Sequence, residues 1–232
     1  MMRCAVITGG AKRIGAAISN ALLDDGWMVY IHCNSSVEEA EEIAEGRDAI
    51  VVQADLGTDT GVKHLVDSIE NQNIDLLIHN ASIYRKEDFE QVTGQLLRDY
   101  SRIHFEVPFL LTQALLPKIK SRKGSVIGIV DTSWNHSWEG LSHYTATKGA
   151  LRQLLVNLAG ELAPDVRVNG IAPGAIIAAE WEQESFDKIV ESVPLRRAGD
   201  PIDIANAVKF LADADYITGS VSYTHLTLPT KA

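Results

Sequence analysis

The chain has 232 residues, which suits one large domain, and 46 % of them are hydrophobic, enough for a sizeable core. Its formal charge is −10, with 21 Lys and Arg against 31 Asp and Glu and no long basic run, which argues against nucleic acid or an anionic membrane as the main partner. The two cysteines, the lack of a signal-peptide pattern and the lack of a span-length apolar run lead us to expect a protein of the reducing cytoplasm.

Short apolar segments alternate with longer amphipathic segments along the chain. Near-continuous apolar character is typical of strands in a parallel sheet that is covered on both faces. The predicted strands are 4–8, 28–32, 49–54, 76–80, 126–131 and 167–172, and the predicted helices are 14–25, 37–45, 61–71, 94–120, 142–162 and 201–212. This order predicts an α/β fold of three layers, with a Rossmann-like doubly wound parallel sheet.

The turn after the first predicted strand has the features of a phosphate site. Gly9 follows the strand and Gly15 opens the helix, so that backbone N–H groups can approach a pyrophosphate at a helix N-terminus. The turn also carries two cations, Lys12 and Arg13. We predict that it binds a dinucleotide, with ligands beyond the carboxyl ends of the strands.

The end of the second strand indicates which dinucleotide is bound. The chain there reads His32-Cys33-Asn34-Ser35-Ser36, without the carboxylate that usually binds the ribose hydroxyls of NAD. A carboxylate would repel the 2′-phosphate of NADP, and a cation would attract it. The sequence therefore favours NADPH, with Lys12 either near the phosphate or in solvent.

A tyrosine and a lysine share one face of the fifth predicted helix. Tyr144 and Lys148 are four residues apart. A nearby ammonium group favours the phenolate, so we expect the pKa of Tyr144 to fall below its usual value of about 10 and the phenol to donate a proton near neutral pH.

These residues and four further motifs resemble the short-chain dehydrogenase/reductase family. The motifs are Asp55-Leu56, Asn80-Ala81, "VRVNGIAPG" at 166–174 and "YITG" at 216–219, and the resemblance spans residues 3 to about 220. It implies that Tyr144 is the acid, that Lys148 orients it and binds the nicotinamide ribose, and that Asp55 contacts adenine. The implied cofactor site comprises Gly9, Arg13, Ile14, Gly15, His32, Asn34, Ser35, Asp55, Leu56, Asn80, Ala81, Lys148, Pro173 and Gly174.

Departures from the family pattern resemble its pteridine reductase branch, and the bacterial dihydromonapterin reductases in particular. Asp131 stands where most members have a serine, thirteen residues before the tyrosine, and Arg13 replaces the middle glycine of the turn. His79-Asn80-Ala81-Ser82 replaces the usual Asn-Asn-Ala-Gly. His104 stands where relatives carry the asparagine of a proton relay, and is either a water-holding relay group or a satisfied helix histidine.

The chemistry of a pterin is consistent with these departures. Reduction of a ring C=N needs a hydride at carbon and a proton at nitrogen, which Asp131 beside Tyr144 can pass on. Tyr84 is placed to stack on the flat ring, and Arg13 to bind both a cofactor phosphate and the carbonyl side of the pterin. The predicted substrate residues are Arg13, Ser82, Tyr84, Asp131 and Tyr144. The alternatives are a strand-end cap for Asp131 and a loop aromatic over the core for Tyr84.

The remaining segments are less informative. Trp134, His136 and Trp138 either line the substrate mouth or pack the loop, and no His/Cys spacing suggests a metal site. By resemblance, helices 94–120 and 142–162 pair in a homodimer or homotetramer, and 176–193 forms a substrate lid. One domain covers residues 1–232. About the last twelve residues, 221–232, depart from the family and suggest a non-native tail, although 221–228 alternates like an edge strand.

Three functions follow from the sequence. The first is an NADPH-dependent reductase that converts a dihydropterin, dihydromonapterin or, less efficiently, dihydrofolate, to its tetrahydro form. The second is a carbonyl reductase or alcohol dehydrogenase of the same fold acting on another small substrate. The third is a nucleotide-binding protein that no longer turns over, against which the intact Tyr144 and Lys148 argue.

Overall fold

A seven-stranded parallel sheet forms the centre of the protein. The computed structural model describes residues 2–69, 72–132 and 137–224. The strand order is β3-β2-β1-β4-β5-β6-β7, so the order reverses between β1 and β4, as in a doubly wound sheet. The predicted fold class is confirmed. The strands are β1 (Cys4–Ile7), β2 (Met28–Cys33), β3 (Ala49–Gln53), β4 (Leu76–His79), β5 (Ser125–Ile129), β6 (Arg167–Ala172) and β7 (Val221–Tyr223).

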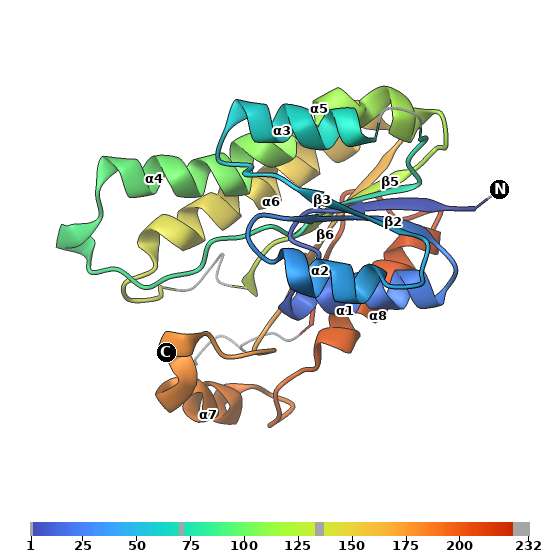
Figure 1. Cartoon of the computed structure of the whole chain (residues 1–232). Helices are drawn as coiled ribbons and strands as arrows, with labels where there is room; N and C mark the ends of the chain where they lie inside the picture. Colours follow the sequence, from blue (N-terminus) through green and yellow to red (C-terminus); the bar gives the residue numbers. More distant parts are fainter. Residues whose placement is uncertain (1, 70–71, 133–136, 225–232) are drawn as a thin grey trace.

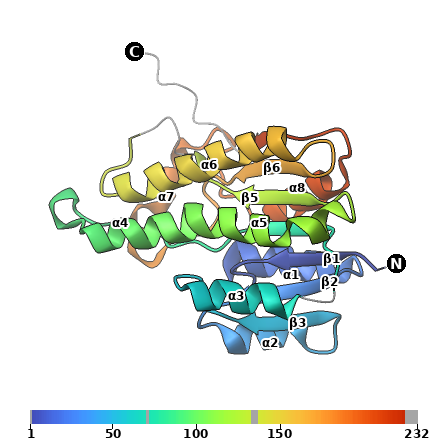
Figure 2. The ribbon, with the colours of Figure 1, turned by 90° about the horizontal axis from the view of Figure 1, so that it is seen from above.

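Helices cover both faces of the sheet (Figure 1). One face carries α1 (Arg13–Asp24), α2 (Val37–Ala44) and α8 (Pro201–Asp213), and the other carries α3 (Asp59–Ser68), α5 (Val107–Lys120) and α6 (Ser142–Leu162), which Figure 2 shows lying across the sheet. Successive strand residues point to opposite faces. Thus Cys4 and Val6 of β1 belong to the core under α5 and α6, whereas Ala5 and Ile7 belong to the core under α1 and α8.

The helix predicted over 94–120 has a π-helical turn in its middle. It consists of α4 (Gly94–Ser101), the turn η2 (Arg102–Glu106) and α5. Thr93 caps α4, since its side chain accepts from the backbone N–H of Leu96. A π turn inserts one residue into the helix and is frequent at functional sites. Here it contains His104, whose side chain is fully buried.

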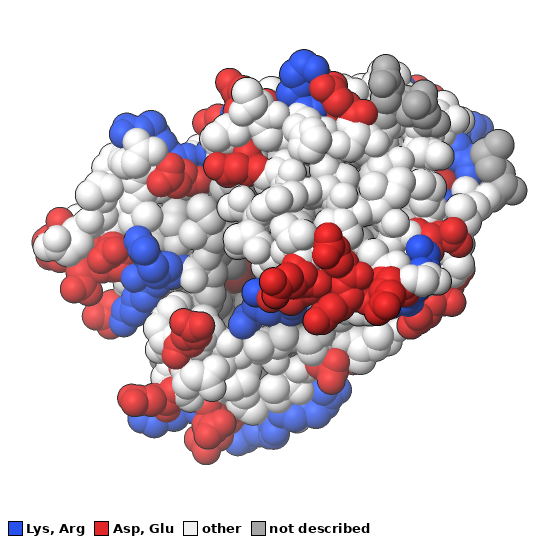
Figure 3. Space-filling model, viewed as in Figure 1, with Lys and Arg blue, Asp and Glu red and all other residues white. Residues whose placement is uncertain are grey.

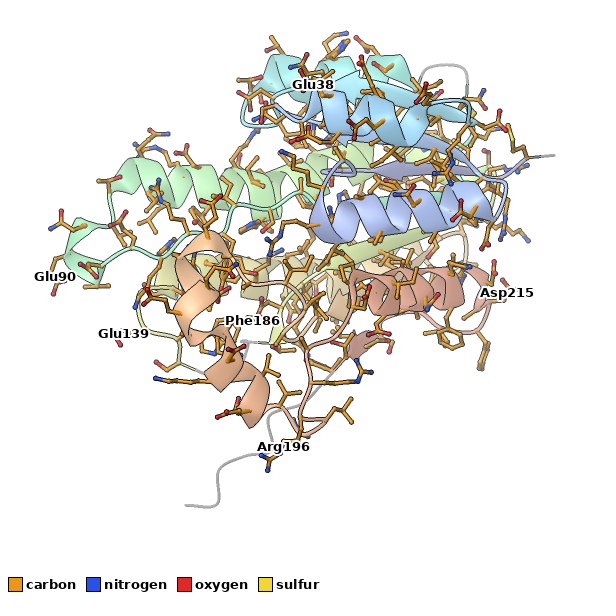
Figure 4. All side chains as sticks on the ribbon, turned by 60° about the horizontal axis from the view of Figure 1, so that its bottom comes forward. Glu38, Glu90, Glu139, Phe186, Arg196 and Asp215 are labelled. Atoms are coloured by element: carbon orange, nitrogen blue, oxygen red, sulfur yellow. The ribbon has the colours of Figure 1, made fainter. Side chains whose placement is uncertain are left out.

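The predicted lid segment, residues 176–193, is partly helical. It contains the short 3-10 helix η4 (Glu180–Glu182), followed by α7 (Gln183–Ser192). Another 3-10 helix, η1 (Phe89–Gln91), lies outside the lid segment, between β4 and α4. The segment stands out from the helical layers in Figure 1. In Figure 4, Phe186 is labelled on α7 and Arg196 in the chain beyond it. This position brings the start of the lid segment over the carboxyl ends of the strands.

Residues 221–224 complete the edge of the sheet. Val221 pairs with Gly170 and Tyr223 with Ala172, in parallel register. The hydroxyl of Thr224 accepts from the N–H of Gly174 at 2.9 Å. The expected edge strand is therefore present over Val221–Tyr223, and residues 225–232 lie outside the described part of the chain. A single domain with a non-native end stays a prediction.

A pair of glycine substitutions tests how the β1–α1 turn is built. A Cβ on Gly15 would lie 2.0 Å from the carbonyl oxygen of Gly9, whereas a Cβ on Gly160 of α6 meets nothing within 4 Å. Gly15→Ala should lower the free energy of unfolding by about 1–3 kcal/mol and weaken NADP⁺ binding. Gly160→Ala should raise it by about 0.5–1 kcal/mol because alanine favours a helix interior. Urea unfolding with and without NADP⁺ measures both, and equal stability of the two variants would contradict this account of the turn.

Candidate active site

Two adjoining cavities lie at the carboxyl ends of the strands. One of about 690 Å³ is lined by His32, Asn34, Asp55 and Leu56, and one of about 640 Å³ by Gly9, Arg13, Ile14, Gly15, Asn80, Tyr84, Asp131, Tyr144, Lys148, Pro173 and Gly174. Both are lined by Ala81 and Ser82, so they form one long site across the strand-order reversal. Figure 3 shows this face of the molecule hollowed beside cationic side chains, next to a ridge of acidic ones over α2. Of the predicted cofactor residues, Ser35 does not line either cavity.

The turn between β1 and α1 is held from the neighbouring strand β4. The amide of Asn80 donates to the carbonyls of Thr8 at 3.0 Å and Gly9 at 2.8 Å. The hydroxyl of Thr8 accepts from the N–H groups of Asn80 and Ala81. Gly9 has φ 64°, which favours glycine, and Gly15 leaves room only for a hydrogen. This crowded cradle at the N-terminus of α1 fits the pyrophosphate of a dinucleotide.

His32 supports the turn from beneath. Its Nδ1 accepts from the N–H of Gly9 at 3.0 Å, and its Nε2 donates to the carbonyl of Ala54 at 3.0 Å. Burial lowers the pKa of the imidazole, so the ring stays neutral in this arrangement. Both ring nitrogens are engaged inside the protein, and its direct contact with the cofactor stays a prediction.

Lys12 does not simply point into solvent. Its Nζ lies 2.6 Å from a carboxylate oxygen of Glu39 on α2. The ion pair is exposed, and it draws the pKa of Glu39 below its usual range. The cation therefore lies between the nucleotide turn and the start of α2.

Tyr144, the predicted catalytic tyrosine, is hydrogen-bonded to the carboxylate of Asp131, which follows β5. The hydroxyl of Tyr144 donates to Oδ2 of Asp131 at 2.7 Å. Burial, and then the negative charge of Asp131, raise the pKa of Tyr144 well above its usual value. The expected lowering of this pKa is wrong, because the phenol is buried and is in direct contact with the carboxylate. Tyr144 is therefore held protonated, which suits a group that gives up its proton only during reaction.

Lys148 lies one helical turn beyond the tyrosine, deep in the protein. Its Nζ donates to the carbonyl of Ile129 at 2.9 Å and lies 5.9 Å from the ring centre of Tyr144. Burial lowers the pKa of this ammonium from 10.5 to about 8, and the charge of Asp131 partly offsets the effect. The lysine therefore carries its charge at neutral pH but loses it in mildly alkaline solution.

His104 lies behind the site and connects two of its walls. Nε2 accepts from the N–H of Ile83 at 3.2 Å and contacts the hydroxyl of Ser82 at 2.9 Å, and Nδ1 donates to the hydroxyl of Thr147 at 2.8 Å. Burial, and then the charge of Lys148, lower the pKa of His104 to about 2. The ring is thus neutral and fully bonded, which matches the expectation of a satisfied helix histidine. A relay role stays a prediction.

Tyr84 packs against the ring of Tyr144. Its ring centre lies 4.7 Å from that of Tyr144 and 5.1 Å from that of Trp181. Its hydroxyl donates to Oε1 of Glu182 at 2.6 Å. Trp181 and Glu182 come from η4, at the start of the lid segment. The sequence predicts a lid at 176–193, but no periodicity or motif marks either residue within it.

Arg13 makes contacts that the sequence did not predict. The residue has φ 54°, where a side chain is strained, and its guanidinium donates to the carbonyls of Ile177 at 2.8 Å and Ala178 at 3.0 Å. The turn is thereby tied to the lid segment. Trp138, in the loop before α6, packs against the buried cluster of Tyr100, Leu141 and Tyr144.

Two features are absent from the residues that the structure describes. These residues contain no group of three or more His, Cys, Asp or Glu side chains that could hold a metal ion, and no helix long and apolar enough to cross a membrane. Trp134 and His136 lie outside the described residues.

Comparison with known proteins identifies the family. The model of the short chain dehydrogenase family matches residues 3–189. The chain belongs to this family. It is 35 % identical to an uncharacterized oxidoreductase of Methylorubrum extorquens, with 94 % of each chain covered, and 28 % identical to the 3-oxoacyl-[acyl-carrier-protein] reductase FabG of Staphylococcus epidermidis, with 97 % and 98 % covered.

Solved structures of this dehydrogenase family identify the cofactor. FolM alternative dihydrofolate reductase 1 from Brucella suis, in complex with NADP, is 33 % identical with a TM-score of 0.89, over 95 % of this chain and 92 % of that one. The angucycline C-6 ketoreductase LanV with bound NADP has the same TM-score at 25 % identity, over 95 % and 93 %. Together with the cradle and the absence of a carboxylate at 32–36, they assign NADPH as cofactor. When bound, it supplies the hydride.

The lowered pKa of Lys148 predicts the alkaline side of the pH–rate profile. The ammonium is present below about pH 8 and lost as the pH rises through that value, so kcat/KM for NADPH-dependent reduction should fall by a factor of ten per unit above it. In Lys148→Arg the charge persists, and the remaining activity should be flat across the same range. Steady-state NADPH oxidation between pH 6 and 9.5 measures both profiles. A wild-type rate that stays constant to pH 9.5 would refute the assignment.

The contacts of Arg13 predict that the lid segment becomes more mobile when this arginine is replaced. Arg13→Gly removes two hydrogen bonds to residues 177 and 178, so amide hydrogen exchange over 177–182 should speed up several-fold. Lys12→Gln, a neighbouring charge loss that touches α2 rather than the lid segment, should leave this exchange unchanged. Mass spectrometry of both variants decides the point. Equal exchange in Arg13→Gly and wild type would show that the guanidinium does not hold the lid.

Proposed function

We propose that the protein reduces a dihydropterin to its tetrahydro form with NADPH. Dihydromonapterin is the proposed substrate, with dihydrofolate as a weaker one. The observation that carries the proposal is the hydrogen bond that Tyr144 donates to Asp131. By resemblance to the family, most relatives have a serine at the position of this carboxylate. The likeness to the FolM alternative dihydrofolate reductase supports it.

The two residues have different tasks in this reaction. Tyr144, protonated because of burial and the neighbouring negative charge, donates its proton to the ring nitrogen. Asp131 accepts a hydrogen bond from the phenol, so its carboxylate can take up a proton from solvent and pass it to the phenolate that remains, and its charge favours the N–H donors of a pterin over a plain ketone oxygen. A serine hydroxyl at this position would polarise a carbonyl, but it carries no negative charge and is too weak a base to take up a proton at neutral pH.

Other residues shape the substrate slot. Tyr84, packed between Tyr144 and Trp181, offers an aromatic face for a flat heterocycle. Arg13, Ser82 and Tyr84 line the same cavity, and three of the five donors of the Arg13 guanidinium remain beyond its bonds to the lid segment. These donors suit the proposed contacts with a cofactor phosphate and with the pterin carbonyl.

A carbonyl reductase or alcohol dehydrogenase acting on another small substrate is the alternative. The 28 % identity to FabG and the likeness to a ketoreductase favour it. In that case Asp131 serves as a strand-end acceptor, and Tyr144 protonates a carbonyl oxygen. The substrate profile separates the two functions.

We further propose a homodimer or homotetramer in the cytoplasm. Exposed apolar residues lie on the outer face of the long helices, with Phe109 of α5 42 % exposed and Val156 of α6 37 % exposed. Such a surface is typical of a helix pair that packs against another copy.

Replacement of the carboxylate tests the proposed chemistry. Asp131→Ser should lower kcat/KM for 7,8-dihydromonapterin by about a hundredfold, because the proton supply is lost, and leave the Kd for NADPH within about twofold. Assays of NADPH oxidation with the dihydropterin and with a panel of ketones, and fluorescence titration of NADPH, measure these values. Wild-type enzyme that turns over ketones but no dihydropterin would reject the proposal, and tight NADPH binding without turnover of anything would support a non-catalytic protein.

A further inference from the structure

The loop that follows β3 forms one wall of the cavity of about 690 Å³. Its residues 55–59 all line this cavity, next to His32 and Asn34 at the end of β2. Tyr144 and Lys148 line the adjoining cavity, and the pyrophosphate cradle lies at the turn between β1 and α1. A dinucleotide whose nicotinamide lies beside Tyr144 therefore places its adenosine half against the loop at 55–59.

This loop is shaped by its own hydrogen bonds and anchored by a distant helix. The carboxylate of Asp55 accepts from the N–H of Gly57 at 2.9 Å, and the carbonyl of Asp55 accepts from the hydroxyl of Thr58 at 2.9 Å. The carbonyl of Leu56 instead accepts from Nε of Arg102 at 3.3 Å. Leu56 is buried, and a carbonyl in such a place needs a donor. Arg102 therefore fixes the position of the middle of the loop.

Two carboxylates hold the guanidinium of Arg102 in place for this contact. Its Nη2 lies 2.6 Å from Oδ1 of Asp59, at the end of the same loop, and its Nη1 lies 3.3 Å from Oε2 of Glu106, in the same π-helical turn. The arginine side chain is only 15 % exposed. A planar guanidinium reaches three acceptors in different directions, which a compact ammonium group does not. Arg102 thus joins two points of the loop, Leu56 and Asp59, to the π-helical turn.

We propose that Arg102 is a positioning residue that holds the loop at 55–59 in the form that binds the adenosine half of NADPH. A loop that is ordered before the ligand arrives loses less conformational entropy on binding, so the cofactor binds more tightly. The same π-helical turn carries His104, which bonds to Ile83 and Thr147 on the side of Tyr144. The turn therefore supports both halves of the site. The inference concerns the cofactor alone and does not depend on which substrate is reduced.

Arg102→Met tests the proposal, with Arg98→Met as its matched control. Methionine keeps an apolar stem and has no hydrogen-bond donor. Both arginines line the same cavity, but Arg98 is exposed and bonds to Gln95 of its own helix. The Kd of NADP⁺, measured by calorimetry, should rise about tenfold in Arg102→Met and less than about twofold in Arg98→Met. An equal rise in both variants would mean that the cavity needs positive charge rather than an ordered loop, and would overturn the proposal.

Adenosine 2′,5′-bisphosphate isolates the half of the cofactor that lies against the loop. Its Kd should rise in Arg102→Met by the same factor as the Kd of NADP⁺, within about twofold, because the change lies far from the nicotinamide half. Unchanged affinity for the bisphosphate, beside weakened binding of NADP⁺, would place the effect outside the adenosine half and contradict the proposal.

Amide hydrogen exchange of the free protein tests whether Arg102 orders the loop before the cofactor binds. Exchange over residues 56–61 should speed up several-fold in Arg102→Met and stay at the wild-type rate in Arg98→Met. Weakened NADP⁺ binding without faster exchange would mean that Arg102 acts by touching the cofactor, and the positioning role would be wrong.

Arg102→Lys separates the geometry of the guanidinium from its charge and is the milder change for folding. The ammonium keeps the charge but does not span the three acceptors, so both Kd values should still rise at least about threefold. Urea unfolding without ligand checks that each variant is folded. Wild-type affinity and wild-type exchange in Arg102→Lys would show that charge alone suffices, and would overturn the proposal even if Arg102→Met does not fold.

Discussion

The contact between the phenol of Tyr144 and the carboxylate of Asp131 is the interaction on which the site depends. It joins the first turn of α6 to the end of β5, two elements that the doubly wound sheet brings together. The carboxylate and the burial of the phenol act in the same direction and keep the proton on oxygen. An enzyme that reduces its substrate needs this state, because the proton must be present when the hydride arrives.

Surrounding residues hold this contact in place. His104, in the π-helical turn between α4 and α5, joins the loop after β4 to Thr147 on α6, one turn beyond the tyrosine. On the other side, the lid segment is tied at two points, through Arg13 to the nucleotide turn and through Glu182 to Tyr84. The cofactor cradle and the substrate slot therefore share the lid as a common wall. Each of these connections is a hydrogen bond, and those made by the charged side chains of Arg13 and Glu182 to neutral partners are charge-assisted.

The fold could be predicted from the sequence because its signals are local. The alternation of apolar strands with amphipathic helices predicts a parallel sheet, and the glycines mark its first turn. The structure confirms the predicted sheet. Tyr144 and Lys148 could be placed together on α6 because four residues make about one helical turn. The π turn around His104 could not, since the same apolar pattern suits a continuous helix over 94–120.

The errors at the site have one physical cause, which is that its electrostatics depend on contacts between distant residues. The pKa of Tyr144 was expected to fall because Lys148 lies nearby in sequence, but burial of the phenol and then its direct contact with the carboxylate of Asp131 raise that pKa. Glu182 reaches Tyr84 across a separation of 98 residues, and Arg13 reaches Ile177 across 164. No spacing rule in a single sequence reports such contacts.

The central claim is that Tyr144 supplies the proton to the ring nitrogen of a dihydropterin while NADPH reduces it. Single-turnover oxidation of bound NADPH by 7,8-dihydromonapterin, followed by absorbance in wild type and Tyr144→Phe, tests it most directly. The account predicts that the variant binds NADPH as wild type does and transfers hydride at least a hundred times more slowly. A Tyr144→Phe rate within a few-fold of wild type would contradict it.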